Sequence, residues 1–170
     1  MSFSTPYTPF ETQKESYVHH LIQNLVVTDK LTPLTKTMME ENNINHILAI
    51  LPQKNQYLAL NKDIPNVPFH VMDYGEGHDM SINLEKYNDC CRQIEKKARK
   101  NENVLVFCNN GFQRSTPFLA YYLIKHQNNE ISNIEKAVDV IIPIIDQDNY
   151  VTQREMYVNN LKLLLPKSMH

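Results

Sequence analysis

The chain has 170 residues, of which 42% are apolar and 21% charged, and its formal net charge is −2. These values are typical of one globular domain, and the sequence has neither a basic excess that would attract nucleic acid nor a run of about 18 apolar residues that could span a membrane. Three cysteines are too few for a disulfide framework and predict a reducing compartment, the cytoplasm or alternatively the nucleus.

The predicted elements follow an N-terminal segment, residues 1–14, which is rich in Ser, Thr and Pro and is expected to be flexible. One folded domain is predicted over residues 15–168. Its first half contains three short apolar runs that predict strands, with a helix before the second strand. The strands are predicted at 25–27, 46–51 and 69–72, and the helix at 34–43.

Longer elements make up the second half of the domain. Asn83 is a good N-cap for a helix whose apolar residues recur at intervals of three and four as far as Ala98. The continuous apolar run 104–107 predicts a buried parallel strand. Helices are predicted at 115–126, 133–142 and 151–165, the last two separated by Pro143 and a polar loop. This alternation predicts a single α/β domain with a central, mostly parallel sheet of about four to five strands flanked by helices.

The strongest chemical signal is the segment Cys108-Asn109-Asn110-Gly111-Phe112-Gln113-Arg114-Ser115, which joins a predicted buried strand to a predicted helix. Such a loop points backbone N–H groups inward, and the helix dipole adds positive potential. A thiolate is stabilised there, so Cys108 is predicted to be a nucleophile near neutral pH. Arg114 can hold two phosphate oxygens, Gly111 permits a sharp turn, and Ser115 can donate a hydrogen bond to the thiolate.

A Cys followed six residues later by an Arg also arises by chance, and buried cysteines are mostly structural. The preceding strand, the following helix and the intervening glycine together favour a phosphate-binding loop. The pattern Cys-x-x-Gly-x-x-Arg-Ser resembles the signature of the dual-specificity branch of the cysteine-dependent protein tyrosine phosphatases. Residues 43–48, 83–87 and 120–123 are also similar to that family, so the resemblance covers roughly residues 20–165.

This resemblance implies a phosphotyrosine-phosphatase-like fold and a two-step reaction. Cys108 attacks phosphorus, a carboxylic acid protonates the leaving oxygen, and water hydrolyses the cysteinyl-phosphate. It implies Arg114 and Ser115 as further catalytic residues, and neither a metal nor another cofactor. The substrate-binding residues would be those of the loop interior: Asn109, Asn110, Gly111, Phe112 and Gln113.

The general acid is left open among three carboxylates, because the family places it roughly thirty residues before the Cys on a loop after a strand. Asp73, Glu76 and Asp79 lie 35, 32 and 29 residues before Cys108. Counting from the end of the strand favours Glu76, whereas counting back from the Asn83 helix favours Asp79. Asp79 is the first choice, Glu76 the second and Asp73 the third, because Asp73 is expected still to belong to the strand.

Phe107 stands where the family usually has a His that orders the loop. The alternative to an efficient enzyme is therefore a pseudophosphatase that binds phosphoprotein with little or no turnover. The loop interior contains no Lys, which favours a mono-phosphorylated protein substrate over an RNA 5′ end or an inositol phosphate. The resemblance thus implies a protein-tyrosine or dual-specificity phosphatase with a phosphoprotein partner, and a monomer and a homodimer both remain open.

The other cysteines and the histidines receive structural interpretations. Cys91 belongs to the apolar stripe of its helix and is predicted in the core, whereas Cys90 is predicted to be a peripheral thiol. The histidines lack the spacing of a zinc site with any cysteine pair. Tyr121 and Tyr122 are predicted to pack in the core.

Overall fold

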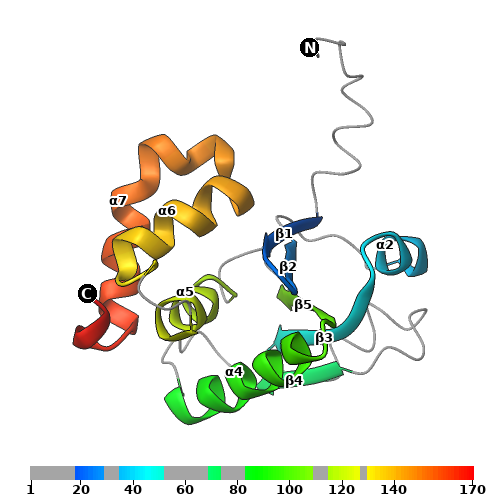
Figure 1. Cartoon of the computed structure of the whole chain (residues 1–170). Coiled ribbons are helices and arrows are strands. Elements are labelled where there is room, and N and C mark those ends of the chain that lie inside the picture. The colour runs from blue at the N-terminus through cyan, green and yellow to red at the C-terminus, as the bar shows by residue number, and fades with distance from the viewer. Residues whose placement is uncertain (1–17, 29–34, 52–68, 74–82, 109–114, 127–129) are drawn as a thin grey trace, which may run out of the picture.

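The computed structural model describes residues 18–28, 35–51, 69–73, 83–108, 115–126 and 130–170 (Figure 1). The predicted flexible segment 1–14 lies outside these residues. The strands are β1 (Val18–Ile22), β2 (Leu25–Thr28), β3 (Ile44–Leu51), β4 (Phe69–Asp73) and β5 (Asn103–Cys108). The helices are α2 (Lys36–Glu41), α4 (Leu84–Arg99), α5 (Ser115–His126), α6 (Ile134–Ile145), α7 (Gln147–Leu164) and the 3-10 helix η1 (Lys167–Met169).

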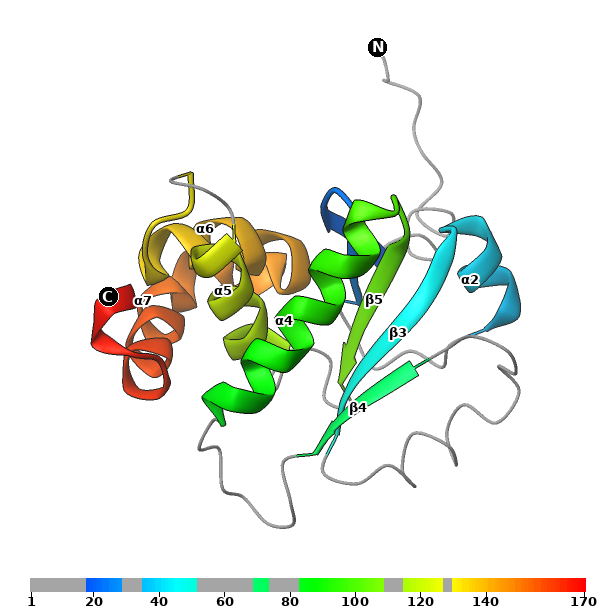
Figure 2. The ribbon, with the colours of Figure 1, turned by 60° about the horizontal axis from the view of Figure 1, so that its bottom comes forward.

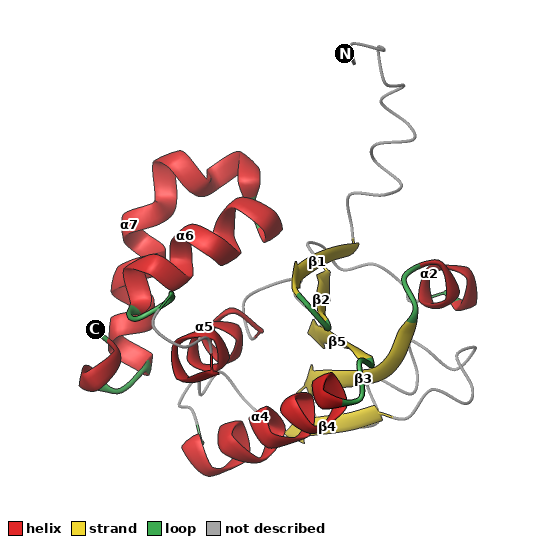
Figure 3. Cartoon of the chain, in the orientation of Figure 1, coloured by secondary structure: helices red, strands yellow, loops and turns green. Residues whose placement is uncertain are grey.

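The five strands form one sheet in the order β1-β2-β5-β3-β4 (Figure 3). Strands β2, β5, β3 and β4 pair in parallel, and β1 pairs with β2 in antiparallel fashion at one edge. This confirms the predicted α/β domain with a mostly parallel sheet. Because all four parallel strands run the same way, their carboxyl ends meet at one edge of the sheet, where α/β proteins usually bind ligands.

Alternate residues of the central strands are buried on opposite faces of the sheet, as the period of two requires. One face packs into the main core cluster with α4, α5, α6 and α7, through Leu25, Val27, Leu48, Ile50, Val104 and Val106. The buried residues of the opposite register are Val26, Ile47, Ala49 and Leu105. Figure 2 shows the four long helices on one side of the sheet and α2 on the other. The continuous apolar runs of the sequence therefore reflect burial on both faces.

Three asparagines adopt left-handed backbone conformations just before parallel strands. Asn24, Asn43 and Asn101 have φ values of 68°, 52° and 56°, a region that Asn tolerates better than most residues. The Nδ2 of Asn24 donates to Oδ1 of Asn101 and to Oδ1 of Asn103, both at 3.1 Å. Side-chain amides thus join the turns at the amino edge of the sheet, opposite the edge where Cys108 ends β5.

The structure corrects the prediction for the last two helices. Helix α6 does not stop before Pro143 but continues to Ile145, and α7 begins at Gln147, so that Asp146 alone separates them. A proline inside a helix removes one backbone hydrogen bond and costs about 3 kcal/mol. That cost is offset because Ile141, Ile142 and Ile145 beside it are almost fully buried. Among the described helices, none is long and apolar enough to cross a membrane.

Candidate active site

Cys108 is the last residue of β5, which lies between β2 and β3 in the middle of the sheet. Its backbone is in register with Ile50 of β3, and the next described element is α5, which begins at Ser115. The predicted strand and the predicted helix on either side of the loop are thus confirmed. The intervening residues of the predicted phosphate site lie outside the described residues: Asn109, Asn110, Gly111, Phe112, Gln113 and Arg114.

The start of α5 is held rigidly by burial. Ser115 and Thr116 are only 3% and 4% exposed, and every residue from Ser115 to Leu123 is buried. Pro117 lies in the first turn, where its missing N–H costs no helical hydrogen bond. The amino end of this 12-residue helix therefore has a fixed position after the loop, and helix amino ends favour anions.

The candidate general acids belong to the connection between β4 and α4. Asp73 is the last residue of β4, as predicted, and its backbone is in register with Leu51 of β3. Cys108 and Asp73 therefore end strands on either side of β3, about 10 Å apart given the usual spacing of about 4.8 Å between neighbouring strands. Glu76 and Asp79 lie outside the described residues.

Asn83 marks the other end of this connection and caps α4. Its side chain accepts a hydrogen bond from the backbone N of Lys86 at 3.2 Å, which confirms the predicted N-cap. The predicted apolar stripe of this helix includes Leu84, but Leu84 is 39% exposed. The buried stripe begins one turn later, at the fully buried Tyr87.

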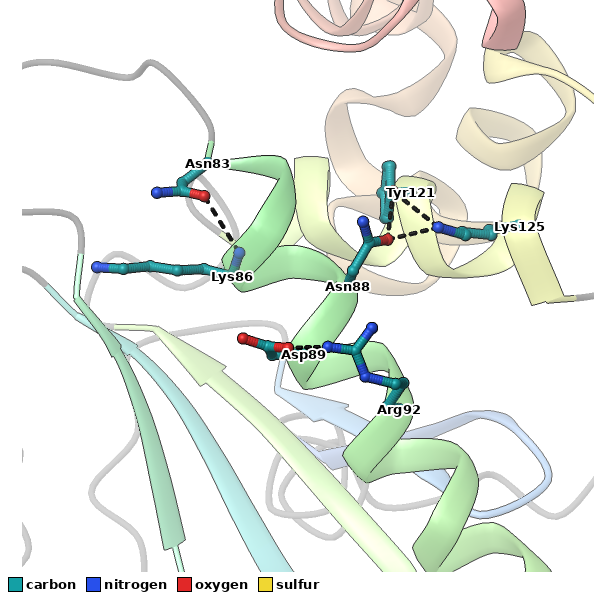
Figure 4. A network of polar contacts seen from close by, with 7 residues as sticks. All are labelled: Asn83, Lys86, Asn88, Asp89, Arg92, Tyr121 and Lys125. Carbon is teal, nitrogen blue, oxygen red and sulfur yellow. Dashed lines mark hydrogen bonds and ion pairs between the residues drawn. The ribbon is translucent and has the colours of Figure 1, made fainter.

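Helices α4 and α5, which follow the two loops of interest, are joined by aromatic and polar contacts. The ring of Tyr87 meets Phe118 edge-on at a centroid distance of 5.3 Å and Tyr121 at 5.4 Å. The hydroxyl of Tyr121 donates to Oδ1 of Asn88 at 2.6 Å, and Nζ of Lys125 donates to the same oxygen (Figure 4). These contacts fix the starts of the two helices relative to each other. Sequence reasoning placed Tyr121 in the core but missed this network, for which the spacing of Tyr121 and Lys125 by four residues was the available signal.

The prediction that Cys90 is peripheral is wrong. Cys90 and Cys91 are both 1% exposed, because α4 packs against β5 on one side and α5 on the other. Burial raises the pKa of both thiols to about 12, so neither is a nucleophile at neutral pH. Cys91, Tyr121 and Tyr122 lie in the core as predicted.

Two of the described histidines lie against carboxylates. Nδ1 of His126 lies 2.6 Å from Oε1 of Glu95, and Nε2 of His46 lies 3.4 Å from Oε2 of Glu102. Within the described ranges, no group of three or more His, Cys, Asp or Glu side chains could hold a metal ion.

Comparisons with known proteins identify the family. Residues 27–163 match the family model of the dual specificity phosphatase catalytic domain. No curated protein sequence matches the chain significantly.

Three solved structures of similar architecture are human DUSP28, a mouse putative dual specificity phosphatase complexed with zinc tungstate, and a leucine rich repeat and phosphatase domain containing protein from Entamoeba histolytica. The human protein is 15% identical, with a TM-score of 0.61, and the match covers 86% of this chain and 95% of that one. The mouse protein is 17% identical, with a TM-score of 0.60, and the match covers 89% of this chain and 94% of that one. The Entamoeba protein is 18% identical, with a TM-score of 0.57, and the match covers 91% of this chain and 96% of that one. At these identities the structures show a shared fold. The match to the family model covers most of the chain and shows that the chain belongs to the dual specificity phosphatase catalytic domain family.

Proposed function

We propose that the chain is a protein phosphatase that removes phosphate from phosphotyrosine, and also from phosphoserine and phosphothreonine, through a cysteinyl-phosphate on Cys108. The observation that carries this proposal is the place of Cys108 at the carboxyl end of the central strand β5, seven residues before α5 begins at Ser115. Family membership supports the hydrolase class.

In the first step the Cys108 thiolate attacks phosphorus, the S–P bond forms, and the P–O bond of the ester breaks. A carboxylic acid, for which Asp79 is the first candidate, gives its proton to the leaving oxygen. Arg114 binds the equatorial oxygens, where charge develops in the transition state. In the second step the carboxylate takes a proton from water, the water oxygen attacks phosphorus, and the S–P bond breaks. Ser115 donates a hydrogen bond to the departing thiolate, and inorganic phosphate is released.

The sheet supports placing the acid in the connection between β4 and α4. That connection starts at Asp73, which shares the carboxyl edge of the sheet with Cys108 and is separated from it by β3 alone. Asp79, Glu76 and Asp73 remain the candidates in that order.

A phosphoprotein-binding pseudophosphatase is the second candidate, and Phe107 favours it. An apolar side chain at this position cannot make the hydrogen bonds that the family's His makes to the loop. The amides of the loop and the amino end of α5 would still bind a phosphate group, so binding is expected in either case and turnover distinguishes the two candidates.

The test is turnover of p-nitrophenyl phosphate and of a phosphotyrosine peptide between pH 5 and 7. We expect activity in the wild-type protein, its loss in Cys108→Ser, and inhibition by vanadate. Phe107→His should raise the activity. If the wild-type protein turns over no more substrate than Cys108→Ser while both bind the phosphopeptide, the chain is a pseudophosphatase.

The general acid is identified by replacing the three carboxylates in turn: Asp79→Asn, Glu76→Gln and Asp73→Asn. Loss of the acid should lower kcat by about 10²-fold or more. If all three variants keep wild-type kcat, the acid lies elsewhere in the chain and the assignment is wrong.

A further inference from the structure

A second candidate binding site lies at the amino edge of the sheet, away from Cys108. It is an open pocket of about 590 Å³ between the turn that joins β1 to β2 and the last two turns of α4. Gln23 and Asn24 line it from the turn, Glu95 and Arg99 line it from α4, and Tyr122 of α5 completes it. Tyr122 is the most buried of these residues, at 5% exposed.

Tyr122 brings an unused hydrogen-bonding group to this pocket. Its ring stacks on His126, with centroids 5.0 Å apart and planes 29° apart, but its hydroxyl has no hydrogen-bond partner among the described residues. Burial raises the pKa of Tyr122 to about 12. The hydroxyl therefore keeps its proton at neutral pH and can donate a hydrogen bond to a ligand.

The carboxyl end of α4, which contributes Arg99 to the pocket, is basic. Lys96, Lys97 and Arg99 lie in the last turn of α4, and Lys100 caps the helix. None of these four side chains forms an ion pair with a described residue, whereas the nearby Glu95 is already paired with His126. Basic residues at a helix carboxyl end stabilise the helix through its dipole. The dipole accounts for some of this charge, and Arg99 is the basic residue of this helix end that lines the adjacent pocket.

We propose that this pocket and the basic end of α4 beside it dock an acidic, extended peptide segment of the phosphoprotein substrate. A carboxylate of the segment would pair with Arg99, and a peptide carbonyl would accept the hydrogen bond of the Tyr122 hydroxyl. The proposal rests on the proposed function, since it assigns a docking site to the same substrate.

The geometry sets the spacing between the acidic segment and the phosphorylated residue. The pocket lies beside Asn24, which is hydrogen-bonded to Asn103 at the start of β5, and Cys108 ends that strand. Five residue steps along a strand span about 17 Å. An extended chain therefore needs at least five residues to connect the sites, and about ten to follow the surface. Docking at this distance raises the effective concentration of the phosphorylated residue and should lower KM.

Docking can be measured without catalysis. The probe is a fluorescein-labelled, unphosphorylated peptide in which four Asp or Glu residues alternate with Ala, and binding is followed by fluorescence anisotropy. We expect saturable binding, weakened about fivefold or more by Arg99→Ala and by Tyr122→Phe. Tyr122→Phe keeps the ring that stacks on His126, so the fold is preserved. The matched control is Arg92→Ala, which removes an exposed charge of the same helix that is paired with Asp89 and should leave binding unchanged.

Equal losses in Arg92→Ala and Arg99→Ala, or unchanged binding in Tyr122→Phe, would show diffuse charge attraction and overturn the proposal. So would a lack of saturable binding by the wild-type protein.

The kinetic test compares two phosphopeptides that differ only in a cluster about ten residues from the phosphorylated residue, acidic in one and alanine in the other. The acidic peptide should have a KM about tenfold lower at equal kcat, and Arg99→Ala should abolish this difference. Turnover of both peptides with one KM would overturn the docking site and leave the proposed function standing. Saturable binding of the unphosphorylated probe without any turnover would support the docking site and refute the proposed function.

Discussion

The contact between α4 and α5 rests on Phe118, and its contribution to stability can be calculated. Phe118 is fully buried, and its ring meets Tyr87 edge-on at 5.3 Å with an interplanar angle of 88°. Replacing a core Phe by Ala costs about 3–5 kcal/mol, of which an aromatic pair accounts for about 1 kcal/mol. A domain of this size loses about 2–4 °C in Tm for each kcal/mol. Phe118→Ala should therefore lower Tm by about 10 °C.

The measurement is thermal unfolding followed by circular dichroism, with urea unfolding for the free energy. The matched control is Leu163→Ala on α7, since Leu163 is an apolar residue of which 85% is exposed. Its replacement should change the free energy of unfolding by less than about 0.5 kcal/mol. If the two variants unfold at the same temperature, Phe118 does not hold the two helices together and the packing described above is wrong.

Three further predictions concern the buried thiols and a helix cap. Iodoacetamide at pH 8 should label the folded chain at Cys108 and not at Cys90 or Cys91, as mass spectrometry would detect; a label on either of these two would contradict their burial. Burial raises the pKa of the Cys90 and Cys91 thiols from 9.0 to about 12 in the folded chain. The contribution of these two thiols to stability is therefore fully present below pH 9 and is lost as the pH rises from 9 to about 12. Urea midpoints measured across this pH range would test this loss. Asn133→Ala should cost about 1 kcal/mol in urea unfolding, since its side chain accepts from the backbone N of Lys136 at 3.0 Å; an unchanged midpoint would show that this cap contributes nothing.

Local signals were sufficient for most of the fold. The strands β2, β3 and β5 were predictable because strands buried on both faces are continuously apolar, and β4 was predictable from its short apolar run. Asn83 and Asn133 were readable as the starts of α4 and α6, since both side chains accept a backbone hydrogen bond three residues on. The start of α5 at Ser115 was predicted, and β5 extends one residue beyond each end of the predicted strand 104–107.

The features that the sequence did not reveal depend on tertiary contacts. Strand β1 carries two histidines in five residues and is a strand because it pairs with β2 across a turn that Asn24 closes. Pro143 stays inside α6 because the isoleucines around it are buried against other helices. Cys90 is buried because α4 has two packed sides, which a stripe on one face does not predict.

Phe107 bears both on the fold and on the proposed reaction. Its apolar character helps to identify β5 as a buried strand, and the same residue replaces the family's His next to the nucleophile. Its backbone is in register with Ala49 of β3, and the neighbouring Val106 pairs with Val27 of β2. Because the backbone of β5 is held between these two strands, Phe107→His should change the side chain and leave the position of Cys108 unaltered. A gain in activity in that variant would then be due to the hydrogen bonds of the imidazole, and an unchanged rate would show that the absent His does not limit catalysis in this chain.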